Sequence, residues 1–257
     1  MPGKHRNRHR QSAATNDASS RVRRALPTWK RALDIACLIF AAPALIGLMG
    51  IIAVLIRISS RGPVLFRQER IGLGGKPFSC FKFRTMKHGG ENAATSSHEE
   101  YLKSLVGSDR PMRKRDLQDG RVLPIGFLLR ASGLDELPQV FNIMRGEMSL
   151  VGPRPCLRCE YEEYSPEQRE RFQAVPGLTG LWQVSGKNET TFQEMIDFDI
   201  TYSRNLSLAQ DIAILFRTFP VLFRQSTATL ENKRYRNFAS VHDQPVRKRQ
   251  VRPLTTV

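Results

Sequence analysis

The longest apolar stretch of the chain, Ile35 to Ile56, has 22 residues and carries no charge. As a helix it would be about 33 Å long, enough to cross a hydrocarbon core of about 30 Å. It begins too far into the chain and is too long for a secretory signal. Pro43 lies inside it, where a proline removes one backbone hydrogen bond and bends a helix. The pattern therefore predicts a bent membrane helix.

Basic residues flank this stretch on both sides: Arg23, Arg24, Lys30 and Arg31 before it, and Arg57, Arg61, Arg67 and Arg70 after it. Because positively charged flanks stay in the cytoplasm, both ends are expected on that side. A hairpin that enters one leaflet and returns satisfies this constraint and uses the bend. A tilted, kinked helix that spans the bilayer is the alternative, and a helix in a soluble core is a third.

Alternating residues over 62–86 predict two short strands around a glycine-rich turn. The turn is not a phosphate-binding P-loop, because Pro77 stands where serine or threonine is required. Residues 87–120 are polar and predict a surface loop with a short helix near residues 99–106.

Two later stretches each allow two interpretations. Residues 211–225 are apolar but contain Arg217, Pro220 and Arg224, which suits a helix at a membrane interface or one packed in the core. Residues 174–188 are rich in glycine and contain Trp182, which suits either a structural loop or a backbone that approaches a ligand.

The net charge of +16 is concentrated at the two ends of the 257-residue chain. Residues 1–31 hold nine Lys and Arg against Asp17, and residues 232–257 hold seven against Asp243, so the body is nearly neutral. Polybasic tails bind anionic lipid or nucleic acid, or remain solvated. No nucleic-acid-binding module is recognisable in the body, so we expect anionic lipid and no nucleic acid.

The four cysteines do not predict a metal site. Cys156 and Cys159 form a single C-x-x-C with no second pair and no histidine nearby in sequence. A structural zinc usually needs four ligands, so ordinary reduced thiols are the better interpretation.

The stretch "LDELPQ" places Asp135 and Glu136 side by side at a predicted helix start, where acidic residues also simply complement the helix dipole. Guanidinium groups fit phosphate oxygens, and carboxylates suit Mg²⁺ or act as nucleophiles toward phosphorus. Beside a membrane segment, such a set suggests phosphoryl transfer involving a lipid. The charged residues considered with the pair are Lys82, Arg84, Arg130, Arg154 and Asp199.

Seven stretches follow one another between about residue 29 and residue 219: "KRALD", "GPVLFRQERIG", "KFRTM", "LDELPQ", "MSLVGPRP", "PGLTGLWQVSGKN" and "FDITYSRNLSLAQDIAIL". In these stretches and their order the chain resembles the bacterial sugar transferases, the monotopic phosphoglycosyltransferases that load a sugar 1-phosphate onto polyprenyl phosphate.

The resemblance implies a re-entrant membrane helix bent at Pro43, a UDP-hexose donor and an undecaprenyl phosphate acceptor at the inner membrane, with the catalytic part in the cytoplasm. It implies that Asp135 is the nucleophile and Glu136 its acidic partner, with Mg²⁺ near both. By the same match, the residues implied to hold phosphate are Lys82, Arg130 and Arg154, and Asp199 completes the polar site. Galactose or glucose phosphate for exopolysaccharide is the expected sugar.

We therefore expect a mostly helical α+β fold, with a re-entrant membrane helix hairpin, interfacial amphipathic helices and a small β-hairpin around a cytoplasmic catalytic core. The expected segments are a disordered basic tail at 1–28, the membrane helix at 29–60, the catalytic domain at 61–225 and a basic tail at 226–257.

The sequence departs from the family pattern at three positions. Gly133 stands where serine is usual, Ala42 precedes Pro43 in place of serine, and Lys187 replaces a common arginine. The first bears on the helix cap, the second on how firmly the bend is fixed, and the third keeps the charge but loses the guanidinium fork.

Two other functions fit parts of the pattern. A membrane-anchored scaffolding or nucleic-acid-binding protein would use the basic tails and show no donor turnover. A lipid-linked phosphatase or nucleotide-sugar hydrolase would use the same carboxylates and release sugar phosphate without an acceptor.

Overall fold

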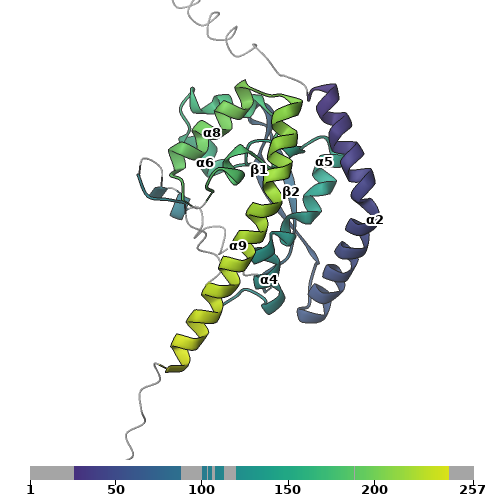
Figure 1. The fold of residues 1–257 in the computed structure, drawn as a ribbon, viewed down its shortest axis with the longest axis vertical. Helices are drawn as coiled ribbons and strands as arrows, with labels where there is room; N and C mark the ends of the chain where they lie inside the picture. Colours follow the sequence, from purple (N-terminus) through teal and green to yellow (C-terminus); the bar gives the residue numbers. More distant parts are fainter. Residues whose placement is uncertain are drawn as a thin grey trace, which may run out of the picture.

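The computed structural model describes residues 26–87, 100–102, 104–105, 108–112, 120–187 and 189–242. Most of the predicted N-terminal tail, most of the predicted loop at 87–120 and the part of the C-terminal tail beyond residue 242 lie outside these residues. The described part is mostly helical, as expected, and contains two small sheets. Figure 1 shows the helix α2 (Thr28–Ser59) along one side and α9 (Leu208–His242) extending beyond the body.

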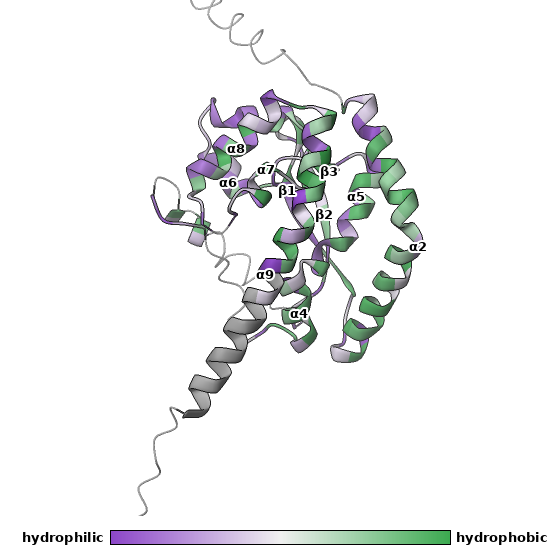
Figure 2. Cartoon of the chain, in the orientation of Figure 1, coloured by the Kyte–Doolittle hydropathy of each residue, from purple (hydrophilic) through white to green (hydrophobic). Residues whose placement is uncertain are grey.

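The helix α2 is one helix of 32 residues with Pro43 inside it, not two helices separated by a break. It follows a bowed path (Figure 1), and its outer surface is largely apolar (Figure 2). Lys30 and Asp34 near its start and Ile52 and Ile56 near its end are buried against the body. Among the described residues, α2 is the one helix long and apolar enough to cross a membrane. Only 11% of its most apolar 18-residue stretch is buried.

Charges at the N-terminal end of α2 join it to distant parts of the chain. Lys30 forms a fully buried ion pair with Asp211 of α9, and its Nζ donates to the hydroxyl of Tyr202 at 2.9 Å. Arg31 donates to the carbonyls of Ile143 and Met144, at the C-terminal end of α5 (Val140–Arg145). Lys30, which the sequence suggested as a flanking surface charge, therefore holds α2 to the fold.

The C-terminal end of α2 is held by the residues that follow the second strand. The two terminal nitrogens of Arg84 donate to the carbonyl oxygens of Ser60 and Arg61 at 2.7 and 2.8 Å. A cation at a helix C-terminus also complements the helix dipole. Ile52 and Ile56 pack with Phe83 and with Leu129 of α4 (Pro124–Ser132). Both ends of α2 thus rest on the same body.

The predicted strand–turn–strand is confirmed. β1 (Leu65–Ile71) pairs antiparallel with β2 (Pro77–Phe83), and the 3₁₀ turn η1 (Leu73–Gly75) connects them. Phe66 pairs with Lys82 and Arg70 with Phe78, so alternation places Arg70 and Lys82 on the same face of the hairpin.

A second sheet was not predicted. The three-residue strands β3 (Ser149–Val151) and β4 (Gly177–Thr179) pair in parallel. Directly after β3, a side chain at Gly152 would place its Cβ 2.2 Å from the carbonyl oxygen of Val175, so only glycine fits. This close approach holds the turn that begins at Gly152 against the glycine-rich residues 174–188. The glycine-rich segment therefore has a structural role.

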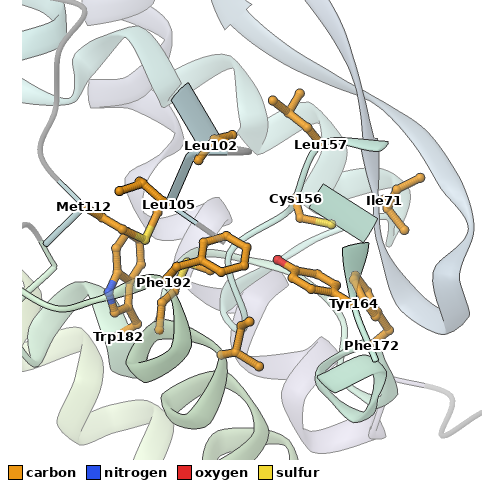
Figure 3. Close-up of a cluster of buried hydrophobic side chains, with 12 residues drawn as sticks. Ile71, Leu102, Leu105, Met112, Cys156, Leu157, Tyr164, Phe172, Trp182 and Phe192 are labelled. Carbon is orange, nitrogen blue, oxygen red and sulfur yellow. The ribbon is translucent and has the colours of Figure 1, made fainter. Parts of the chain in front are cut away.

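The remaining helices surround the main hydrophobic cluster, which Figure 3 shows. The ring of Tyr164 packs at a tilt against the rings of Phe172 and Phe192, and Cys156 is fully buried within the cluster. These helices are α6 (Arg158–Glu163), η4 (Gln168–Gln173), α7 (Leu181–Val184) and α8 (Phe192–Arg204).

The helix predicted at 211–225 is confirmed and forms part of α9, which continues to His242 through much of the segment expected as a tail. One part of it packs in the body, and large apolar side chains on another part are exposed. Asp211 and Ile214 are buried in the body, whereas Phe216, Phe219 and Phe223 are 73–74% exposed.

Candidate active site

The candidate carboxylates lie on a 3₁₀ helix, η3 (Leu134–Gln139), which confirms a helix start at this point. Gly133 has φ +75 and separates η3 from the end of α4. A left-handed backbone favours glycine over serine, which explains the departure from the family pattern at this position. Asp135 is 9% exposed, and Glu136 follows it in the first turn.

The structure brings Lys82 of β2 to this pair. The distance from Lys82 Nζ to Glu136 Oε1 is 2.8 Å, and the two side chains are 22% and 40% exposed. Burial lowers the pKa of Lys82, but the carboxylates of Glu136 and Asp135 outweigh it and raise the pKa above its usual value. A lysine from the hairpin and both adjacent carboxylates therefore form one charged cluster.

Arg130 lies in the last turn of α4, next to the end of β2. Its Nε donates to Thr85 Oγ1 at 2.7 Å. The helix sits very close to Thr85, because a Cβ at Gly126 would lie 2.1 Å from the Thr85 carbonyl oxygen. The stretch "KFRTM" thus directs Lys82 to the carboxylates, Arg84 to the end of α2 and Thr85 to Arg130.

Arg154 belongs to a second charged cluster. It forms an ion pair with Glu160 of α6 at 2.9 Å, and the Glu160 side chain is fully buried. The Tyr164 hydroxyl also donates to Glu160, at 3.4 Å. Arg171 donates to the carbonyl oxygen of Arg154 at 2.9 Å. The position of Arg154 is therefore fixed from two sides.

Asp199 does not open onto the Asp135–Glu136 pair. It forms a completely buried ion pair with Arg171. Burial raises the pKa of Asp199 to about 6, although Arg171 acts in the opposite direction. Through Arg171, this aspartate supports the loop that carries Arg154 rather than presenting a free carboxylate.

Arg70 stands between the two clusters and was not among the sequence candidates. It is 7% exposed, its Nη1 donates to the carbonyl of Pro155 at 3.3 Å, and its charge lowers the pKa of Lys82. Glu160 and Arg171, which contact Arg154, were not predicted either. Alternation along β1 could have indicated Arg70, because it places this basic residue on the inward face of the strand. A charge in such a position normally needs an anion as its partner.

The described residues contain no group of three or more His, Cys, Asp or Glu side chains that could hold a metal by themselves. Mg²⁺ does not require one, since it commonly takes one or two carboxylates and completes its shell with substrate phosphates and water. Asp135 and Glu136 are adjacent, and Glu136 is partly exposed while Asp135 is largely buried, so the donor set fits such a two-carboxylate site. Cys156 is fully buried, and burial raises the pKa of its thiol to about 12.

Comparison with known proteins places the chain in a family. The profile of the bacterial sugar transferases matches residues 25–225. The chain belongs to the bacterial sugar transferase family. The matched range begins just before α2, includes both charged clusters and ends within α9.

Several curated members of the bacterial sugar transferase family are similar to this chain. The exopolysaccharide production protein ExoY of Sinorhizobium fredii is 40% identical over 195 residues, covering 75% of this chain and 84% of ExoY. The undecaprenyl-phosphate galactose phosphotransferase of Salmonella typhimurium is 39% identical, covering 77% of this chain and 41% of that protein.

A third relative is a UDP-glucose:undecaprenyl-phosphate glucose-1-phosphate transferase from Caulobacter vibrioides, 40% identical over 77% of this chain and 71% of its own length. The chain thus spans most of ExoY but less than half of the Salmonella protein. Membership of the bacterial sugar transferase family makes the chain a transferase and disfavours a non-enzymatic scaffold.

Proposed function

We propose that the protein transfers a hexose 1-phosphate from a UDP-hexose to undecaprenyl phosphate and releases UMP, as the first membrane step of exopolysaccharide synthesis. The observation that carries the proposal is the cluster of Lys82, Asp135 and Glu136 beside an apolar helix, in which Lys82 contacts Glu136 and the charges of both carboxylates raise its pKa. The names of the relatives, which act on UDP-glucose or undecaprenyl phosphate, supply the substrate classes.

In the first step, a carboxylate oxygen of Asp135 attacks the phosphorus that bears the sugar. A new oxygen–phosphorus bond forms, and the bond to the bridging oxygen breaks, so that UMP leaves with the electron pair. In the second step, an oxygen of the lipid phosphate attacks the same phosphorus and displaces the Asp135 carboxylate. The product is a polyprenyl diphosphate sugar, and the enzyme returns to its starting state.

The neighbouring charges support these steps. Lys82, Arg130 and Arg154 offer donors to phosphate oxygens, which lowers the barrier to attack by an anionic carboxylate. Lys82 already contacts Glu136, so it is held next to the residue that follows the nucleophile Asp135. Asp135 and Glu136 would hold Mg²⁺, which when bound neutralises charge on the donor diphosphate.

The packing of α2 supports entry into a single leaflet. Its two ends contact one body, through Lys30 and Asp34 at the start and Ile52 and Ile56 at the end, while Ile39, Phe40 and Ile46 in its middle are 69–91% exposed. A helix that crossed the bilayer would carry its two ends to opposite sides, away from a common body. A bowed helix that dips into the cytoplasmic leaflet of the inner membrane keeps both contacts and immerses the apolar middle.

Other exposed apolar residues suit the same membrane surface. They are Phe141 and Met144 on α5, directly after η3, and the three phenylalanines Phe216, Phe219 and Phe223 of α9. Large exposed apolar groups beside arginines are typical of helices at the lipid interface. The carboxylate pair would then lie near the headgroups, where a soluble donor and a lipid phosphate can meet.

The proposal is tested by incubating the protein with a panel of UDP-sugars, undecaprenyl phosphate and Mg²⁺, and measuring UMP. We expect UMP release with UDP-galactose or UDP-glucose. Continuous turnover should require the acceptor. Asp135→Asn should remove turnover, whereas Asp197→Asn, on the exposed side of α8, is the matched control. No release with any donor, or sugar phosphate released without acceptor, would contradict the proposal.

A further inference from the structure

Arg70 is a buried cation without an ionic partner. Its residue is 7% exposed, and none of the ion pairs between described residues includes it. Its Nη2 donates to the neutral amide oxygen of Gln68 at 2.7 Å, and its Nε is a buried donor with no hydrogen-bond partner. Arg171, by contrast, is paired directly with Asp199.

Such an arrangement is costly in the empty protein. A buried charge is normally paired, because removal from water is otherwise uncompensated. Burial and the charge of Arg154 lower the pKa of Arg70, although the charge of Glu160 acts in the opposite direction. Neutral partners such as Gln68 and the Pro155 carbonyl satisfy hydrogen bonds but supply no opposite charge.

The carboxylates around Arg70 are engaged with other groups. Glu160 accepts from Arg154 through both oxygens, at 2.9 and 3.2 Å, and also from the Leu157 backbone. Glu136 accepts from Lys82 at 2.8 Å. Glu160 and Glu136 therefore each contact another cation, and neither forms an ion pair with Arg70.

The backbone places this charge between the two clusters. The strand β1 ends where the amide of Ile71 donates to the carbonyl oxygen of Cys156 at 2.9 Å, directly after the turn that carries Arg154. On the other side, Arg70 shares a hairpin face with Lys82, and its charge influences the pKa of Lys82. A ligand bridging Lys82 and Arg154 would pass Arg70.

We infer that Arg70 is a donor-binding residue whose missing counter-ion is the diphosphate of the nucleotide sugar, and that Gln68 orients its guanidinium. This assignment rests on the proposed function. A diphosphate spans more than one cation and carries negative charge on both phosphates, which suits a row of Lys82, Arg70 and Arg154. Gln68 is a positioning residue, since its neutral amide oxygen accepts a hydrogen bond from Nη2 of the guanidinium.

The test measures both binding of UDP and the KM for the UDP-hexose, using the full chain in detergent or nanodiscs. Arg70→Met should weaken UDP binding and raise the donor KM by roughly tenfold or more, the loss expected for a charge-assisted hydrogen bond. Arg70→Lys should give an intermediate effect. The KM for undecaprenyl phosphate should change little in both variants.

Gln68→Glu supplies a sharper test that preserves size. It would give Arg70 an internal carboxylate, so UDP affinity should fall several-fold while the unfolding temperature stays equal or rises. Arg158→Met is the matched control, because Arg158 is an exposed arginine that pairs with Glu69 next to Arg70 at 2.9 Å. We expect its donor KM to match the wild type.

The outcomes separate this inference from the proposed function. Wild-type protein that binds UDP and turns over, with Arg70→Lys and Gln68→Glu unchanged in UDP affinity and donor KM, would overturn the role of Arg70 alone. Wild-type protein that neither binds UDP nor releases UMP would overturn both. If Arg70→Met fails to fold, the Gln68→Glu and Arg70→Lys measurements still decide the question.

Discussion

The buried ion pair between Lys30 and Asp211 gives a quantitative test of how α2 is attached to the body. Both side chains are 1% exposed. Lys30→Met keeps the length and most of the volume of the side chain but removes its charge. Asp211 would then keep the hydrogen bond from the Tyr202 hydroxyl, which donates to it at 2.6 Å.

The expected cost follows from this burial. Breaking a buried pair by removing one partner typically costs about 3–5 kcal/mol, because the other charge remains uncompensated. For a domain of this size, that corresponds to a fall in Tm of roughly 6–20 °C. Asp34 also faces Lys30. It keeps its two hydrogen bonds from Ser149 and Leu150, at 3.0 and 2.9 Å, and these bonds limit the loss of stability.

The double variant Lys30→Met/Asp211→Leu should recover much of the loss. It replaces both charges with apolar groups, and such replacements of buried pairs are often close to neutral. The Tyr202 hydroxyl can still donate to the carbonyl of Val151, which lies at 3.2 Å. We expect the double variant to be more stable than the sum of the two single variants predicts by about 2 kcal/mol or more.

The assay is thermal and denaturant unfolding of all four proteins in the same detergent, completed as a double-mutant cycle. Arg204→Met, at an exposed ion pair with Glu170, serves as the control and should change stability by less than about 1 kcal/mol. Strictly additive single variants, or a Lys30→Met variant as stable as the wild type, would refute the view that this pair holds α2 in place.

Three further results are expected. Burial acts to raise the pKa of Glu160, but the charges of Arg154, Arg70 and Arg171 outweigh it and hold the pKa below 4.5. The stabilising contribution of ionised Glu160 is therefore present above about pH 4.5 and is lost as the pH falls. Glu160→Gln should flatten the decline of Tm in acid, and an unchanged decline would count against this role of Glu160. At pH 8, Cys156 should resist alkylation in the native protein while the partly exposed Cys159 reacts, because Cys156 is fully buried with its pKa raised by burial to about 12; equal rates would disprove this. Phe219→Glu should weaken binding to anionic vesicles several-fold without lowering Tm, since its side chain is 73% exposed, and unchanged binding would remove α9 from the membrane surface.

The elements that could be predicted from the sequence are those with a local pattern. The uncharged run gave α2, alternation around a glycine turn gave the β1–β2 hairpin, and the acidic pair after Gly133 gave the start of η3. Each of these is decided by residues within a few positions of one another. The proximity of Lys82 to Glu136 came from the family resemblance rather than from spacing, because the two residues are 54 positions apart.

The contacts that could not be predicted are long-range pairings of buried charges. Nothing near Lys30 in the sequence indicates Asp211, 181 positions away, and a flanking lysine ordinarily faces water or headgroups. The family resemblance implied that Asp199 completes the polar site, and its own neighbours in sequence do not reveal its partner Arg171. The sheet of β3 and β4 escaped notice for a similar reason, since three-residue strands carry too little alternation to be recognised.

The central claim is that Asp135 becomes covalently linked to the phosphate of the sugar, at a site beside the membrane. The most direct measurement is the intact mass of the protein after incubation with a UDP-hexose and Mg²⁺ but no lipid acceptor, followed by peptide mapping. We predict an added hexose phosphate on Asp135 that disappears when undecaprenyl phosphate is supplied, and no adduct on Asp135→Asn, which should remain bound to membranes. An Asp135→Asn protein that still turns over at the wild-type rate, or an adduct on another residue, would contradict the account.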